Sequence, residues 1–239
     1  MRVLQLWRYP VKSLQGERLG SVPVTVNGIE GDRQFAIFDA ETGFGLTARR
    51  VPELLYASAR LRADGGGVEV TLPDGSIADD DRALSAWLGR LVNLRSTAED
   101  STRRYENVVD FEQEKISKWE PFNGAHGAFH DAQGANVSLM SLATIGSWER
   151  RRFRTNVILD GDDEESFLGS RVGLGDCLLD VGMHIQRCVM ITRPQPGGIE
   201  RDLDVLRTIN AERGSLLGVS AMVTRAGTVT IGDELRVDR

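Results

Sequence analysis

The chain of 239 residues contains only two cysteines, Cys177 and Cys188. Two thiols are too few for a conventional iron–sulfur cluster, which takes four cysteine ligands. A disulfide between them would need an oxidising compartment, and the start of the chain lacks the long apolar segment of a secretory signal. We therefore expect two reduced thiols and a cytoplasmic location. Any electrons for redox chemistry would then come from another protein.

Several other features are also missing. No apolar run approaches the roughly 20 residues that a membrane-spanning helix needs. The net charge of −6 argues against a general nucleic-acid binder, because such proteins present a cationic surface. There is no GxGxxG loop, P-loop or GxSxG elbow, so neither nucleotide binding by those loops nor hydrolase chemistry has support. We therefore expect neither nucleic acid nor membrane as a partner.

Short segments rich in β-branched and aromatic residues dominate what is present. Those in the first 75 residues are separated by Gly, Asp and Asn, which indicates strands and turns, with a hairpin turn at 63–67. The C-terminal part returns to strands, and its glycine-containing, alternating end predicts a hairpin within 216–237. Helical spacing predicts helices near 79–91, 141–152 and 203–211, whereas 96–135 reads as connecting loops. The pattern predicts a mainly β fold with a few helices, closed into a barrel that leaves no free strand edges.

Cys188 is the first candidate for chemistry. It follows Arg187 directly in HIQRCVMITRP, and a nearby cation favours the thiolate that binds metals. The alternative is a small core residue, which is the usual role of a cysteine in an apolar strand. Cys177 alternates with Leu and has no basic neighbour, so we expect it in the core.

A second group of residues could bind an anion. Lys12 and Ser13, in YPVKSLQG, offer a cation beside a hydroxyl, a pair that suits a phosphate. Arg33 precedes an apolar strand, and Thr47 and Arg49 follow a glycine-containing turn. Taken alone, each of these residues is more typical of a solvated loop than of a ligand site.

The segment RRRFRTNVILDG adds Arg154 and Asn156. Strand alternation places both on one face, so both side chains could enter a common pocket for a phosphate or a heterocycle edge. His126 and His130 have helical metal-pair spacing, but the surrounding glycines disfavour a helix there and no HExxH motif supports zinc.

Together these motifs resemble the MOSC domain family, which includes the mitochondrial amidoxime-reducing component. YPVKSLQG, GIEGDRQFAIFD and LTARRVPEL are similar to the β-barrel domain that precedes MOSC domains. FHDA, FRTNVILDG, SFLGSRVGLGD, RCVMITRPQPGG and the closing GSLLGVSAMVTRAGTVTIGDELRV are similar to the MOSC domain itself. The resemblance implies an N-terminal β-barrel subdomain over 1–95 and a MOSC domain over 96–239.

The resemblance also implies a molybdenum cofactor (molybdopterin). Cys188 matches the sulfur ligand to the metal, and Asp131 matches an acidic residue at the active-site loop, a candidate proton donor. Cofactor-binding roles are implied for Lys12, Ser13, Arg33, Thr47, Arg49, Ser138, Arg154, Asn156 and Arg187. Thr155 stands where the family has proline, and the spacing from Asp131 to Ser138 and Ser141 departs from the family pattern.

Three functions stay open. The first is an oxidoreductase that reduces N-hydroxylated or N-oxide compounds with electrons from an external flavin or iron–sulfur reductase. The second is a cofactor carrier, or a sulfur-transfer protein that uses Cys188 as a persulfide; such a protein would not reduce hydroxylamines. The third is a β-barrel that binds a small anion and buries Cys188, which would hold no molybdenum.

Overall fold

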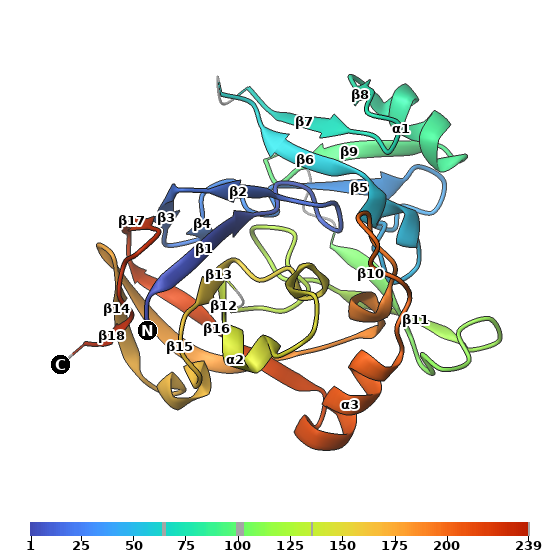
Figure 1. Ribbon diagram of the computed structural model, residues 1–239. Coiled ribbons are helices and arrows are strands. Elements are labelled where there is room, and N and C mark those ends of the chain that lie inside the picture. Colours follow the sequence, from blue (N-terminus) through green and yellow to red (C-terminus); the bar gives the residue numbers. More distant parts are fainter. Residues whose placement is uncertain (64–65, 99–102, 135, 239) are drawn as a thin grey trace.

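The computed structural model describes residues 1–63, 66–98, 103–134 and 136–238. Its largest element is a curled sheet with strand order β18-β14-β15-β16-β12-β13-β1-β2 (Figure 1). In chain order these strands are β1 (Val3–Arg8), β2 (Glu17–Leu19), β12 (Val137–Ser141), β13 (Val157–Leu159), β14 (Arg171–Leu174), β15 (Cys177–Gln186), β16 (Leu216–Arg225) and β18 (Arg236–Val237). Strands from both sides of the predicted boundary at 95/96 therefore share one sheet.

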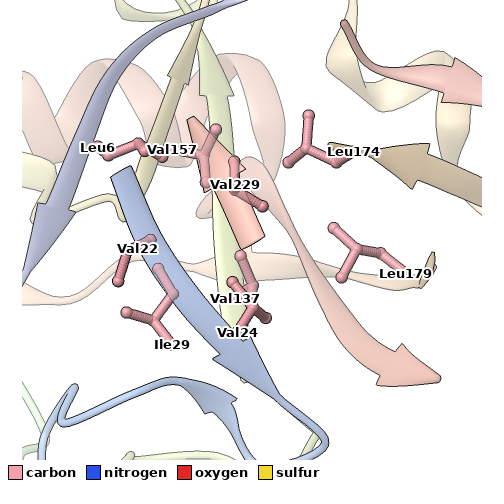
Figure 2. Close-up of a pocket in the computed structure, with 9 residues that line it drawn as sticks. All are labelled: Leu6, Val22, Val24, Ile29, Val137, Val157, Leu174, Leu179 and Val229. Carbon is pink, nitrogen blue, oxygen red and sulfur yellow. The ribbon is translucent and has the colours of Figure 1, made fainter. Parts of the chain in front are cut away.

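A three-stranded sheet lies against the curled sheet and completes an apolar interior. It consists of β17 (Gly227–Thr230), β3 (Ser21–Thr25) and β4 (Gly28–Ile29). Figure 2 shows side chains of both sheets converging on this interior. The free space among them is about 10 Å³, roughly what one water molecule needs. The interior is therefore a packed core, and a ligand has to bind elsewhere.

A second core lies at the upper right of Figure 1, mostly in residues between 35 and 96, and Val11 and Leu14 from the N-terminal segment also belong to it. β5 (Phe35–Asp39) pairs with β9 (Val92–Ser96), and β6 (Ser58–Leu61), β7 (Val68–Thr71) and β8 (Ile77–Ala78) form a small sheet. Helix α1 (Asp81–Leu88) packs beside β9. Asp80 caps its N-terminus by accepting from the backbone of Ala83, and Gly89 ends it in the left-handed conformation that favours glycine. A short 3-10 turn, η1 (Pro52–Tyr56), completes this part.

Residues 96–135, predicted to be connecting loops, contain a β-hairpin. β10 (Arg104–Val108) pairs antiparallel with β11 (Trp119–Asn123). The hairpin lies beside helix α3 (Asp204–Arg213) and the 3-10 turn η4 (Val189–Thr192) (Figure 1). The core beneath them includes Val108, Val189 and Leu206. This packing brings residues from the middle of the chain next to the RCVMITRP segment.

The predicted mainly β fold is confirmed, and two of the three predicted helices occur as α1 and α3. The helix predicted near 141–152 is wrong in extent: α2 (Leu142–Ile145) ends at Gly146, and a separate 3-10 turn, η2 (Arg150–Phe153), follows. The remaining 3-10 turn is η3 (Glu164–Phe167). The predicted turn at 63–67 includes residues outside those described, although the flanking β6 and β7 pair as expected. The closing strands do not form a hairpin, because β17 pairs with β3 instead of β16.

Candidate functional site

The candidate site is built on two turns that are distant in sequence but lie together in the structure. One carries Lys12 and Ser13, and the other carries Arg49. The Lys12–Ser13 turn follows β1, and its backbone is held where Lys12 N donates to Phe35 O at 2.8 Å. Ser13 adopts a positive φ of 70°, which is uncommon for a residue other than glycine. Its Oγ accepts a hydrogen bond of 3.0 Å from Ala48 N. The Ser13 hydroxyl therefore fastens the first turn to the one that carries Arg49.

Lys12 is buried, and all of its identified contacts lie within the site. Its Nζ donates to Phe129 O at 2.9 Å, pairs with Asp131 Oδ1 at 2.5 Å and lies 4.4 Å above the Tyr105 ring. Burial lowers the pKa of Lys12 to about 8, although Asp131 opposes this shift. Lys12 thus keeps its proton at neutral pH but sits much closer to deprotonation than an exposed lysine does.

Arg49 connects Asp131, the carboxylate partner of Lys12, to Cys188. The turn that carries it closes where Arg50 N and Val51 N both donate to Thr47 O, so buried Thr47 shapes the turn through its backbone. Arg49 Nε donates to Cys188 Sγ at 3.2 Å, and Arg49 Nη2 pairs with Asp131 Oδ2. One guanidinium therefore contacts both the thiol and the carboxylate.

Asp131 is ionised in this arrangement. Burial alone would raise its pKa, but Arg49 and Lys12 outweigh burial and hold the pKa well below its usual range. A carboxyl group held ionised by two cations does not suit the role of proton donor that the resemblance implied. Its neighbour His130 is neutral, because burial and then Arg33 lower its pKa to about 4.

The two cysteines lie in different surroundings. Cys177 is fully buried in the barrel core, as predicted, and burial raises the pKa of its thiol to about 11. Cys188 is only partly buried and stands directly before η4 in extended conformation. Its identified polar side-chain contact is the one from Arg49. Cys188 is therefore the more accessible of the two thiols, and it has a cationic hydrogen-bond donor.

Arg187, although adjacent to Cys188 in sequence, bonds elsewhere. Its Nε donates to Leu217 O at 2.9 Å and its Nη1 to Phe153 O at 3.1 Å. Nη2 is buried without a hydrogen-bond partner among the described residues. The cation hydrogen-bonded to the thiol is therefore Arg49, contrary to the expectation from local sequence, while Arg187 joins three backbone segments and leaves one donor unused.

A second cation cluster surrounds Tyr9. The guanidinium carbons of Arg33 and Arg154 lie 5.1 and 4.3 Å from the centre of its ring. Arg33 also pairs with Asp32, and Arg154 donates to Leu14 O. Burial, followed by the neighbouring Arg33, lowers the pKa of Arg154 to about 10. The cluster adds positive charge beside Lys12, since Phe129 binds the Arg33 carbonyl through its N–H and Lys12 through its O.

The polar side chains of three further predicted residues form hydrogen bonds within the fold: Asn156, Ser138 and Ser141. Asn156 Oδ1 accepts from Ser138 Oγ at 2.8 Å and from Ser138 N at 3.2 Å, and Asn156 Nδ2 donates to Trp7 O at 3.2 Å. These bonds tie β12, β13 and β1 together. Ser141 caps α2 by accepting from Thr144 N. Arg154 has a left-handed backbone, with φ of 51°, and β13 begins only at Val157. Strand alternation therefore does not place Arg154 on one face with Asn156, and the cofactor-binding role of Asn156 stays a prediction.

An ion pair between Arg193 and Glu114, which was not predicted from the sequence, holds the backbone of Arg49. Arg193 is paired with both oxygens of Glu114, at 2.7 and 2.5 Å, and also donates to Arg49 O. Glu114 lies in the loop of the β10–β11 hairpin, whose Phe122 faces Arg49 at 5.3 Å. No local signal could have identified this pair, because its members are 79 residues apart.

Five of these cations are less than 10% exposed: Lys12, Arg49, Arg154, Arg187 and Arg193. A protein with net charge −6 thus concentrates buried positive charge around one accessible thiol. Such a donor set fits an anionic ligand that carries a soft metal, because thiolates prefer soft metals and guanidinium and ammonium groups bind phosphate. The unused buried Nη2 of Arg187 is a further donor available to such a ligand.

Comparison with known proteins identifies the domains. The chain matches the MOSC N-terminal beta barrel domain over residues 1–116 and the MOSC domain over residues 126–236. It is similar to the molybdenum cofactor sulfurase of Drosophila grimshawi, at 25% identity over 246 residues. The alignment covers 87% of this chain but only 30% of that protein.

Two solved structures are also similar. The YUAD protein from Bacillus subtilis shares 12% identity with a TM-score of 0.42, over 98% of this chain and 93% of that one. YiiM from Geobacillus stearothermophilus shares 18% identity with a TM-score of 0.36, over 44% of this chain and 55% of that one. In the described residues, no helix combines the length and apolar character that crossing a membrane requires.

Proposed function

The chain belongs to the MOSC family, and we propose that it binds a molybdenum cofactor and reduces N-hydroxylated or N-oxide compounds. Cys188 is the proposed sulfur ligand to the metal. When bound, the cofactor supplies a redox-active metal that exchanges two electrons with the substrate. The chain has two cysteines, too few for a four-cysteine cluster, so a separate flavin or iron–sulfur reductase is the proposed electron donor.

The observation that carries this proposal is the contact between Arg49 Nε and Cys188 Sγ at 3.2 Å, beside the buried Lys12. A structural cysteine would be expected in an apolar core, where Cys177 lies. Cys188 instead stands at the accessible edge of a cation cluster. This placement supports the proposal, because the proposed metal ligand and the proposed anion-binding cations lie within reach of one bound molecule.

The roles of the chain's own residues follow from their contacts. Lys12 and Arg49 bind the anionic part of the cofactor, and Ser13 keeps their two turns together. Arg33 and Arg154 add long-range attraction from their positions at Tyr9. The Arg193–Glu114 pair holds the backbone of Arg49, and thereby the direction in which its guanidinium points.

Sulfur transfer is the second candidate function, and two observations favour it. The similar protein from Drosophila grimshawi is named a molybdenum cofactor sulfurase, and Cys188 is accessible next to a cation. Such a thiol suits a persulfide carrier as well as it suits a metal ligand. A carrier would bind or deliver cofactor or sulfur and would not reduce hydroxylamines.

Metal analysis tests the proposal. The protein and its Cys188→Ala variant are expressed in a host that makes the cofactor, and molybdenum is measured by mass spectrometry. Stoichiometric molybdenum is expected in the parent protein and is expected to be lost in the variant. Cys177→Ala is the matched control: it removes the other thiol and should keep its metal. No molybdenum in the folded parent protein would refute the proposal.

Turnover separates the two candidates. The molybdenum-containing protein is assayed for reduction of a hydroxylamine and an amidoxime with an artificial electron donor. Reduction that disappears in Cys188→Ala supports the oxidoreductase. Bound molybdenum without reduction, together with cyanide-labile sulfur on Cys188, would establish the sulfur-transfer alternative instead.

A further inference from the structure

The two cations best placed to bind an anion already hold one, the Asp131 carboxylate. Its Oδ1 is paired with Lys12 Nζ and its Oδ2 with Arg49 Nη2, so each oxygen has its own cation. The side chains of Lys12 and Arg49 are only 8% and 10% exposed, whereas that of Asp131 is 42% exposed. The carboxylate thus covers the cations from the solvent side.

A carboxylate and a phosphate compete for the same donors. Both accept charge-assisted hydrogen bonds from ammonium and guanidinium groups in similar geometry. Phe129 O and Asp131 take two of the three N–H donors of Lys12 Nζ, and Asp131 takes one donor of Arg49 Nη2. A phosphate that takes these same donors therefore has to replace the carboxylate. A bound dianion would also repel the adjacent carboxylate, which favours departure of Asp131.

Few contacts hold Asp131 in its position, so its side chain can move away from Lys12 and Arg49. The preceding Phe129 is fully buried, and its N–H binds Arg33 O, which anchors the loop on one side. Among the described residues, none forms a hydrogen bond with the backbone of Asp131, which is held through its carboxylate alone. Gly127 and Gly134 flank the segment at positive φ of 83° and 80°, where glycine carries no steric penalty.

We propose that Asp131 is a displaceable internal anion, which occupies the Lys12–Arg49 site until a phosphate-bearing ligand replaces it. This inference rests on the proposed function, because it assigns Lys12 and Arg49 to the anionic part of the cofactor. The exchange keeps the two buried cations neutralised in both states, and it releases a loop next to Cys188 when the ligand binds. Asp131 then gates occupancy of the site and takes no part in chemistry.

Binding of inorganic phosphate to the cofactor-free full chain tests the proposal. Affinity is measured by calorimetry at one fixed pH for the parent protein, Asp131→Asn and a matched control, Asp180→Asn. Asp180 pairs with Arg171 on the exposed side of the barrel, so its variant removes the same charge away from the site. Asp131→Asn is expected to bind phosphate about tenfold more tightly, because a neutral amide competes poorly for cations. The control should match the parent protein.

Unchanged or weaker binding in Asp131→Asn would overturn the proposal and show that Asp131 orients the two cations. A second measurement uses the parent protein only: phosphate should shift the backbone amide signals of Ala132 and Gly134 in NMR spectra, and unshifted signals at saturation would also refute displacement. Absence of phosphate binding in all variants would refute it as well. Molybdenum content is measured separately, so each of these results is distinguishable from failure of the proposed function.

Discussion

Arg49 donates from Nε to the sulfur of Cys188 across 3.2 Å, although 139 residues separate the two in sequence. The same guanidinium binds Asp131 through Nη2. This forked geometry uses two different edges of one planar group, which a lysine cannot reproduce. The relationship explains why Arg49, and not the adjacent Arg187, is the cation bonded to the thiol.

Replacing Arg49 by lysine should therefore lower molybdenum content about tenfold, because a point charge cannot contact the sulfur of Cys188 and the anionic group of the cofactor at the same time. The matched control is Arg50→Lys at the next position, where the side chain is 47% exposed and pairs with Glu106 at 3.7 Å. The control is expected to retain the metal of the parent protein. Metal analysis of both variants checks this, and equal molybdenum in the two would contradict a special role for the Arg49 fork.

Anion binding should weaken as pH rises through about 8. Lys12 is charged below its lowered pKa of about 8 and neutral above it, and only the charged form attracts an anion. Sulfate is a suitable probe, because its own charge stays constant from about pH 6 to about pH 10. We expect its affinity for the cofactor-free protein to fall about tenfold between about pH 7 and about pH 9.

The control for this titration is Lys12→Arg, whose guanidinium stays charged over the whole range. Its sulfate affinity should change little with pH. A pH profile that falls equally in both proteins would assign the titration to another group.

Breaking the Glu114–Arg193 pair should destabilise the fold. The two side chains are 14% and 8% exposed, and Glu114→Gln leaves the buried guanidinium without its counter-charge. We expect the free energy of unfolding to fall by about 3 kcal/mol. Glu112→Gln is the control, since its partner Arg207 and Glu112 itself are each nearly half exposed, and its cost should be much smaller because solvent screens an exposed ion pair. Denaturant titration measures both, and equal costs would show that burial of the first pair is unimportant.

Asn156 should behave as a structural residue. Asn156→Ala removes the side-chain bonds of the buried Asn156 to Ser138 and Trp7 and leaves two partly buried backbone groups without these partners, which should lower stability by about 2 kcal/mol. The protein that folds should still contain molybdenum. Asn136→Ala, which loses a single bond of 3.4 Å to Val26 O, should cost less than about 1 kcal/mol. Loss of metal in Asn156→Ala at unchanged stability would instead show that Asn156 binds the cofactor.

Helix α1, which has a capping and a stop residue in its own sequence, was predicted correctly. Asp80 and Gly89 bracket α1 as a cap and a stop, and both signals are visible in sequence. The β10–β11 hairpin escaped prediction because β10 buries only Tyr105 and Val108 and has no clear alternation. The pairing of β17 with β3 also escaped, because an alternating strand does not indicate which partner it will choose.

The sequence by itself determined the mainly β fold, the family resemblance, the buried place of Cys177 and the set of cations from which the site is built. The tertiary structure alone decided how those residues are used. It placed Arg49 on the sulfur, Asp131 between the two cations and Asn156 in a bond network between strands. The physical reason is that a polar side chain forms hydrogen bonds with the groups that lie within about 3 Å of it. Tertiary packing decides which groups these are, and here it brings together segments that are far apart in the chain.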